Sequence, residues 1–80
     1  MNELTPREEE LVAIGAAIGS NCIHCVEYHI PLARRIGLTD SEILAAIQLA
    51  DKVKQVPARK VMEAAIKLIP TTSSKDATNG

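Results

Sequence analysis

Two capping boxes fix where helices begin in this chain of 80 residues. They are Thr5-Pro6-Arg7-Glu8 and Thr39-Asp40-Ser41-Glu42. In each box, the threonine hydroxyl can accept a hydrogen bond from the backbone N–H three residues later, and the glutamate can accept one from the threonine N–H. Pro6 also suits the first position of a helix, where its missing N–H is not needed. The two boxes predict helices over about residues 6–18 and 40–53.

Turn-forming residues and prolines divide the rest of the chain into further helices. A Gly-Ser-Asn turn ends the first helix, and Ser20 or Asn21 is expected to cap a second helix over about residues 22–36. Pro31 lies inside that helix and predicts a kink. A fourth helix is expected over 57–69, beginning at a proline. Because no alternating apolar pattern or hairpin turn indicates a strand, the predicted fold class is all-α, a small bundle of about four helices.

The apolar residues are numerous but lack large aromatic side chains. They make up 46% of the chain, yet there is no Phe or Trp and only one Tyr. Residues 1–69 are expected to form one helical core domain, and the polar segment 70–80 a disordered tail. A core of this size is marginal when it stands alone. Residues 11–18 are apolar on every side of their helix and are expected to be buried all round. We therefore expect a homo-oligomer whose subunits bury apolar helices against one another.

Charge and hydropathy argue against two classes of partner. Nine basic and ten acidic residues give a net charge of −1, without the basic face that nucleic acid binding needs. No stretch reaches the roughly 20 apolar residues needed to span a membrane. Residues 11–18 follow glutamates and lack the basic flank of a signal peptide. We expect a cytoplasmic protein, in which a cysteine pair is more often catalytic or metal-binding than structural.

All of the cysteines and histidines of the chain fall within eight consecutive residues, as Cys22, His24, Cys25 and His29. On a helix, Cys22, Cys25 and His29 share a face with small and apolar residues, whereas His24 lies on the opposite face. Cys22 lies near the helix N-terminus, where the helix dipole favours a thiolate. His29 can accept a thiol proton. The spacing allows a disulfide in which either cysteine attacks and the other resolves.

The residues alone leave three interpretations of this cluster open. The first is a redox dithiol, which needs no cofactor. The second is a zinc-type helical module that uses Cys22, Cys25 and His29, with Glu10, water or a neighbouring subunit as the fourth ligand. In the third, the cysteines and His29 are ordinary core residues. Glu10 is similarly ambiguous: it shares a helix face with an apolar stripe, which is unusual for an unpaired carboxylate, or it merely ends the acidic first turns.

One carboxylate, two thiols and two imidazoles then form a pattern of fixed spacing, Glu10, Cys22, His24, Cys25 and His29. This pattern resembles the signature of the alkylhydroperoxidase D-like proteins, which belong to the carboxymuconolactone decarboxylase family. The stretch Gly-Leu-Thr-Asp-Ser-Glu-Ile at 37–43 is similar to the turn that follows the signature in that family. The resemblance covers about residues 5–65, so this short chain holds only the core unit.

The resemblance implies an all-α fold that assembles as trimers or hexamers. It implies a thiol-dependent peroxidase that reduces alkyl hydroperoxides, with an external dithiol or protein as reductant and no cofactor. In that scheme Cys25 attacks the hydroperoxide, Cys22 closes the disulfide and joins a proton relay with Glu10 and His29, and His24 assists. A lactone decarboxylase of the same family is the alternative, although that reaction does not depend on a cysteine pair.

Overall fold

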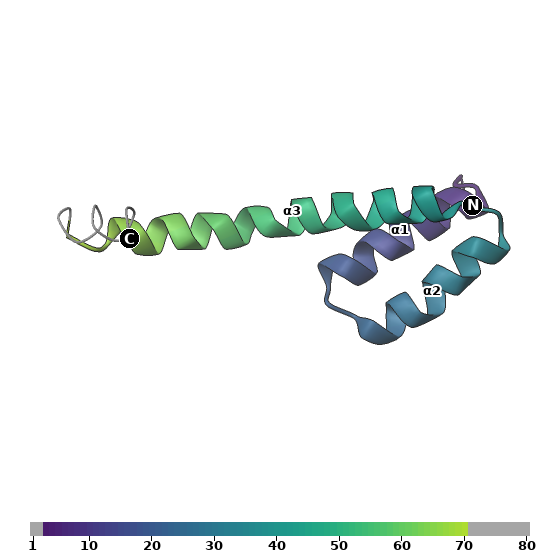
Figure 1. The fold of residues 1–80 in the computed structure, drawn as a ribbon, viewed down its shortest axis with the longest axis horizontal. Helices are drawn as coiled ribbons and strands as arrows, with labels where there is room; N and C mark the ends of the chain where they lie inside the picture. The colour runs from purple at the N-terminus through teal and green to yellow at the C-terminus, as the bar shows by residue number, and fades with distance from the viewer. Residues whose placement is uncertain (1–2, 71–80) are drawn as a thin grey trace.

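The computed structural model describes residues 3–70, and these residues form three helices and no strand (Figure 1). Helix α1 comprises Pro6–Gly19, α2 comprises Ile23–Arg35 and α3 comprises Asp40–Lys67. The all-α class is confirmed, with three helices in the described residues in place of about four. None of these helices combines the length and the apolar character needed to cross a membrane. The predicted tail lies, apart from residue 70, outside the described residues.

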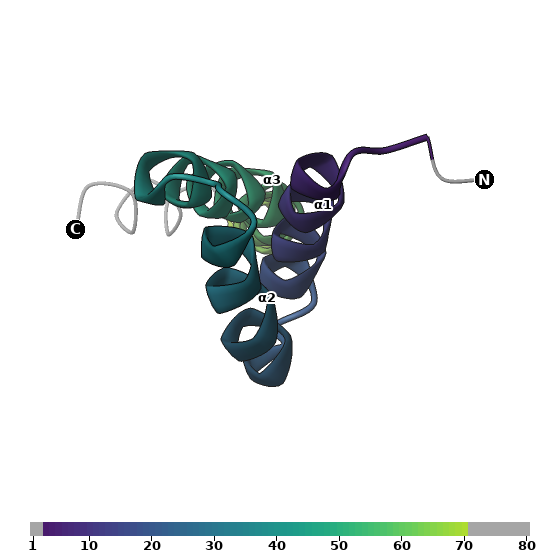
Figure 2. The ribbon, with the colours of Figure 1, turned by 90° about the vertical axis from the view of Figure 1, so that its right-hand side faces the viewer.

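Helix α1 is the centre of the packing. It contacts both other helices, whereas α2 and α3 contact each other little. Figures 1 and 2 show α1 and α2 lying beside the first half of α3, while the second half of α3 extends away from them. The cysteine-bearing helix α2 is therefore held in place mainly through α1.

Both predicted capping boxes are present. The Glu8 N–H donates to Thr5 Oγ1 over 3.1 Å, and the Thr5 N–H donates to Glu8 Oε1 over 2.8 Å. Thr39 and Glu42 make the same two bonds at the start of α3. The bond that Glu42 accepts from the Thr39 backbone holds the pKa of this carboxyl below its ordinary value. Local sequence therefore decides where α1 and α3 begin.

Two arginines fasten the turn between α2 and α3. Arg34 donates two hydrogen bonds to Asp40, over 2.8 and 3.0 Å, and these bonds hold the pKa of Asp40 below its ordinary value. Arg7 reaches across from α1 and donates to the Gly37 carbonyl over 3.0 Å and to Glu42 over 2.6 Å. Gly37 has a φ of 107°, a left-handed conformation that favours glycine just after a helix. The turn is thus tied to all three helices.

The predicted break before Pro57 is wrong, because α3 continues through this proline to Lys67. Proline removes one backbone hydrogen bond from a helix, which leaves the carbonyl four residues earlier without its donor. That carbonyl belongs to Val53, and the loss of this one bond does not end α3. The segments expected as separate helices, 40–53 and 57–69, therefore form one helix. Pro31 likewise lies inside α2.

A small apolar core lies where the three helices meet. Ile14 of α1 is fully buried at its centre. The other buried members are Ala33, Leu38 and Ile43, with Leu11, Ile30, Ala46 and Ile47 packed against them. The prediction that residues 11–18 are buried all round is wrong for a single chain, because α2 and α3 cover only part of α1 and leave Val12 61% exposed.

The second half of α3 exposes many apolar side chains in the single chain. They include Val53, Val56, Val61, Met62 and Ile66, which are between 44% and 67% exposed. An apolar groove of about 430 Å³ also runs between α1 and α3, lined mainly by alanines and leucines. Apolar surface of this extent on one helix is typical of protein interfaces. This surface supports the expectation of a homo-oligomer, and we propose that copies of this chain assemble through α3.

We expect light scattering to find the purified chain as a homo-oligomer, with a trimer or a hexamer as the expected size. Met62→Glu places a carboxylate among the exposed apolar residues of α3 and should shift the chain to smaller species, because burying an unpaired charge is costly. Gln48→Glu adds the same charge at an exposed polar position of α3 and should leave the size unchanged. A stably folded wild-type monomer would contradict this prediction.

Candidate redox site

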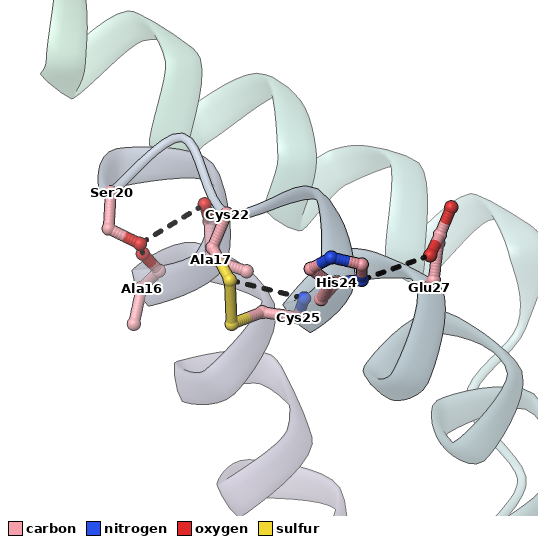
Figure 3. Close-up of a disulfide and its surroundings, with 7 residues drawn as sticks. All are labelled: Ala16, Ala17, Ser20, Cys22, His24, Cys25 and Glu27. Carbon is pink, nitrogen blue, oxygen red and sulfur yellow. Dashed lines mark hydrogen bonds and ion pairs between the residues drawn. A yellow bond between two sulfur atoms is a disulfide. The ribbon is translucent and has the colours of Figure 1, made fainter.

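A tight connection between α1 and α2 places Cys22 at the start of α2. Asn21 has a φ of 57°, a left-handed conformation in which asparagine is enriched. Cys22 is itself the N-cap, because its Sγ accepts a hydrogen bond from the Cys25 N–H over 3.2 Å (Figure 3). The prediction that Ser20 or Asn21 caps α2 is therefore wrong. Ser20 Oγ instead donates to the Ala16 carbonyl over 2.8 Å, at the end of α1.

Cys22 and Cys25 are joined by a disulfide, which is visible in Figure 3. Their Cα atoms lie 5.2 Å apart, within the range that a disulfide can bridge. Both residues are partly buried. In the reduced protein, the unpaired N–H groups and the dipole at the start of α2 stabilise a thiolate there more than a neutral thiol. The first turn of α2 is therefore suited to thiol–disulfide chemistry.

A carboxylate–imidazole pair joins α1 to α2. Glu10 Oε1 lies 2.8 Å from His29 Nδ1. Glu10 is only 9% exposed and the His29 side chain 28%, so the pair is largely screened from water. The contact orients the imidazole and leaves its other nitrogen to exchange a proton. Of the two sequence interpretations of Glu10, the structure favours the buried, paired carboxylate.

Cys22, Cys25 and His29 belong to the start and the first turns of α2, and Glu10 reaches His29 from α1. His29 follows Cys25 by four residues, which puts the imidazole one helical turn from the disulfide. His24 lies apart from them: its side chain is 97% exposed and Nδ1 is 3.7 Å from Glu27 Oε1 (Figure 3). The separate face predicted for His24 is therefore confirmed, and His24 has no direct contact with the Glu10–His29 pair.

Sequence analysis missed Lys54, which lines a pocket of about 350 Å³ beside Cys22. Lys54 belongs to α3, and its Nζ donates to the Ile18 carbonyl over 3.1 Å and to the Asn21 side chain. The lysine thereby fastens the connection that leads into Cys22. No local pattern links a lysine of α3 to a cysteine of α2, so a single sequence offers no signal for this contact.

The metal-binding alternative gains no support from this geometry. Within residues 3–70, no three His, Cys, Asp or Glu side chains gather where they could hold a metal ion. In the disulfide form, the two sulfurs are bonded to each other, whereas metal ligation requires thiolates. Glu10, the suggested fourth ligand, is paired with His29.

The fold and the site together define a small helical protein with a disulfide-forming cysteine pair. The chain belongs to the carboxymuconolactone decarboxylase family, whose sequence model matches residues 1–67. The resemblance found in the sequence is therefore confirmed at the level of the family.

One curated protein is similar to this chain over more than half of the chain's length. "Uncharacterized protein 4 in cox locus" of Paracoccus denitrificans is 35% identical over 51 residues, which are 64% of this chain and 46% of that protein. The matched region is thus less than half of that relative's length. No solved structure matches the chain.

Proposed function

We propose that this chain is a thiol-dependent peroxidase, or a related thiol–disulfide oxidoreductase, that reduces alkyl hydroperoxides. The observation that carries the proposal is the Cys22–Cys25 disulfide one helical turn from the buried Glu10–His29 pair. A redox group beside a proton-exchanging group is what peroxide reduction needs. The family includes decarboxylases and alkyl hydroperoxidases, so membership is consistent with this activity.

The first step oxidises Cys25. Its thiolate attacks the outer oxygen of R–O–O–H, an S–O bond forms and the O–O bond breaks. Cys25 becomes a sulfenic acid, and the alkoxide leaves with the electron pair of the broken bond. His29, oriented by Glu10, supplies the proton that converts the alkoxide to the alcohol. The thiolate, the hydroperoxide and one proton thereby become a sulfenic acid and an alcohol.

The second step closes the disulfide. The Cys22 thiolate attacks the sulfur of the Cys25 sulfenic acid, so that the S–S bond forms and the S–O bond breaks. The oxygen leaves as water after it takes a proton through the relay of Glu10 and His29. Over both steps, two thiols and one hydroperoxide become one disulfide, one alcohol and one water. This product is the oxidised form that the structure contains.

An external thiol reductant completes the cycle. A dithiol or a protein dithiol attacks the disulfide, supplies two electrons and two protons, and is itself oxidised to a disulfide. No further cofactor enters these steps. The proposal places the chain in the cytoplasm, where reductants of this class keep thiols reduced, and in a homo-oligomer. His24, exposed on the outer face of α2, assists from the solvent side.

Thiol counting and intact mass on one preparation test the function. Reduced protein that receives one equivalent of cumene hydroperoxide should lose two thiols and the mass of two hydrogens, and dithiothreitol should restore both. A metal assay on the same sample shows whether the thiols are already ligated. Thiols that survive the peroxide would overturn the proposal. Activity on a lactone acid that survives removal of both cysteines would favour the decarboxylase branch of the family instead.

A further inference from the structure

The pocket beside Cys22 has an apolar wall that comes from two helices. Ala17 and Ile18 contribute from α1, and Ile23 and Val26 from α2. Its volume of about 350 Å³ is in the range of small-molecule sites. Because Cys22 forms part of the wall, a molecule in this pocket lies beside Cys22, whose sulfur is bonded to that of Cys25. The apolar wall of the pocket therefore suits the organic part of a small substrate.

Lys54 gives this pocket a positive charge. The residue is partly buried, and its ammonium donates to the Ile18 carbonyl and to the Asn21 side chain. An ammonium carries three N–H donors, so these two acceptors leave one donor for a ligand. Both acceptors are neutral, and they do not compensate the charge.

Several cations within residues 3–70 have acidic partners, and those without one, apart from the partly buried Lys54, lie in exposed positions. Arg7 pairs with Glu42, and Arg34 pairs with Asp40. Within residues 3–70, no carboxylate pairs with Lys54. A partly desolvated cation without an anionic partner attracts an anion more strongly than a fully hydrated one does. The pocket therefore combines an apolar wall, a redox sulfur and an uncompensated positive charge.

We infer that this pocket selects organic hydroperoxides that carry a carboxylate, with the apolar body against Ile23 and Val26 and the carboxylate bound by Lys54. The inference rests on the proposed peroxidase function and names its substrate class. The chemistry is the same two-step reaction: the hydroperoxide group reacts at the sulfur pair and becomes the alcohol, while the carboxylate is unchanged. Lys54 is a specificity-determining residue in this scheme and transfers no proton.

Paired substrates that differ only in charge test this assignment. The probes are the para-carboxylate of cumene hydroperoxide and its methyl ester, with dithiothreitol as reductant. Wild type should show a kcat/KM for the acid about tenfold above that for the ester, which corresponds to about 1.4 kcal/mol, because only the acid offers the ammonium a charged hydrogen-bond acceptor. Lys54→Met should remove this preference, and Lys54→Arg should retain most of it.

The comparison between acid and ester separates charge recognition from structural damage. Lys54 also fastens the α1–α2 connection, so loss of that support would slow both probes equally. Lys52→Met removes the same charge from an exposed position of α3 and should keep the wild-type preference. If wild type turns over both hydroperoxides with equal kcat/KM, the inference about Lys54 is overturned and the peroxidase function stands.

Binding without turnover tests the pocket independently of the peroxidase function. Calorimetry with para-isopropylbenzoate, which has no peroxide group, on the oxidised protein should show binding that Lys54→Met weakens about tenfold, again about 1.4 kcal/mol. If the acid binds in a Lys54-dependent way but the protein reduces neither hydroperoxide, the peroxidase function is refuted and the anion-binding pocket stands. Binding of this acid that is unchanged by Lys54→Met would refute the pocket assignment.

Discussion

We expect Cys25→Ser to abolish peroxide turnover and to leave the helices intact. A serine hydroxyl is not a nucleophile for peroxide near neutral pH, and it cannot form the disulfide. The fold should persist because Cys25 contributes to the cap of α2 only through its backbone N–H, which donates to Cys22 Sγ and which serine also has. Consumption of cumene hydroperoxide with dithiothreitol measures the activity, and circular dichroism monitors the helices. Full turnover by this variant would show that Cys25 is not the attacking thiol.

Cys22→Ser is the matched variant, because it removes the other sulfur and installs one of the preferred N-cap residues. With Cys25 intact, one equivalent of hydroperoxide should stop at the sulfenic acid, which dimedone captures as an adduct visible by mass. Cys25→Ser should give no such adduct. An adduct on Cys22 in the Cys25→Ser protein would exchange the roles of the two thiols and retain the rest of the mechanism.

Glu10→Gln should lower the rate of peroxide reduction by about 10²–10⁴-fold, the usual contribution of a positioned proton-transfer group. Glutamine preserves the shape of the side chain and a hydrogen bond to His29 but cannot relay a proton. Stopped-flow measurement of thiol loss after mixing with hydroperoxide gives the rate. Glu63→Gln neutralises an exposed carboxylate of α3 and should change the rate less than twofold, roughly the scatter expected for surface substitutions.

Thermal unfolding distinguishes a catalytic role of Glu10 from a structural one. Because the Glu10–His29 contact is largely screened from water, removing its charge changes both stability and chemistry. A variant that melts close to wild type but reacts slowly supports the relay. A variant with wild-type reactivity would reduce Glu10 to an anchor between α1 and α2.

Features that depend on neighbours in sequence could be predicted, as the two capping boxes show. Thr5 and Thr39 each find a partner three residues away, so the chain needs no tertiary contact to specify them. The clustering of Cys22, Cys25 and His29 on one face of α2 is equally local. These short-range rules also supplied the all-α class.

Features that depend on distant residues or on the helix as a whole could not be predicted. Pro57 removes one bond from α3, and its neighbours in sequence do not show that the remaining bonds and packing of the helix outweigh this loss. Glu10 required knowledge of α2, because its partner His29 lies on another helix. The contacts of Lys54 with the α1–α2 connection could not be predicted, because they depend on how α3 passes the end of α1. The cap of α2 is a sulfur acceptor, which the usual preference for oxygen-bearing cap residues does not predict.

The cap formed by Cys22 has a consequence for the speed of the cycle. The sulfur that changes oxidation state is also the atom that accepts the Cys25 N–H. A thiolate at that position can accept the same bond, and more strongly because it is charged. When the disulfide is reduced or re-formed, the acceptor of the Cys25 N–H therefore changes between a disulfide sulfur and a thiolate sulfur at the same position. The first turn of α2 does not unwind. Each redox cycle should therefore require little structural reorganisation. The start of α2 keeps the same backbone conformation when it reacts with the oxidant and with the reductant, so no slow refolding of this turn limits the rate.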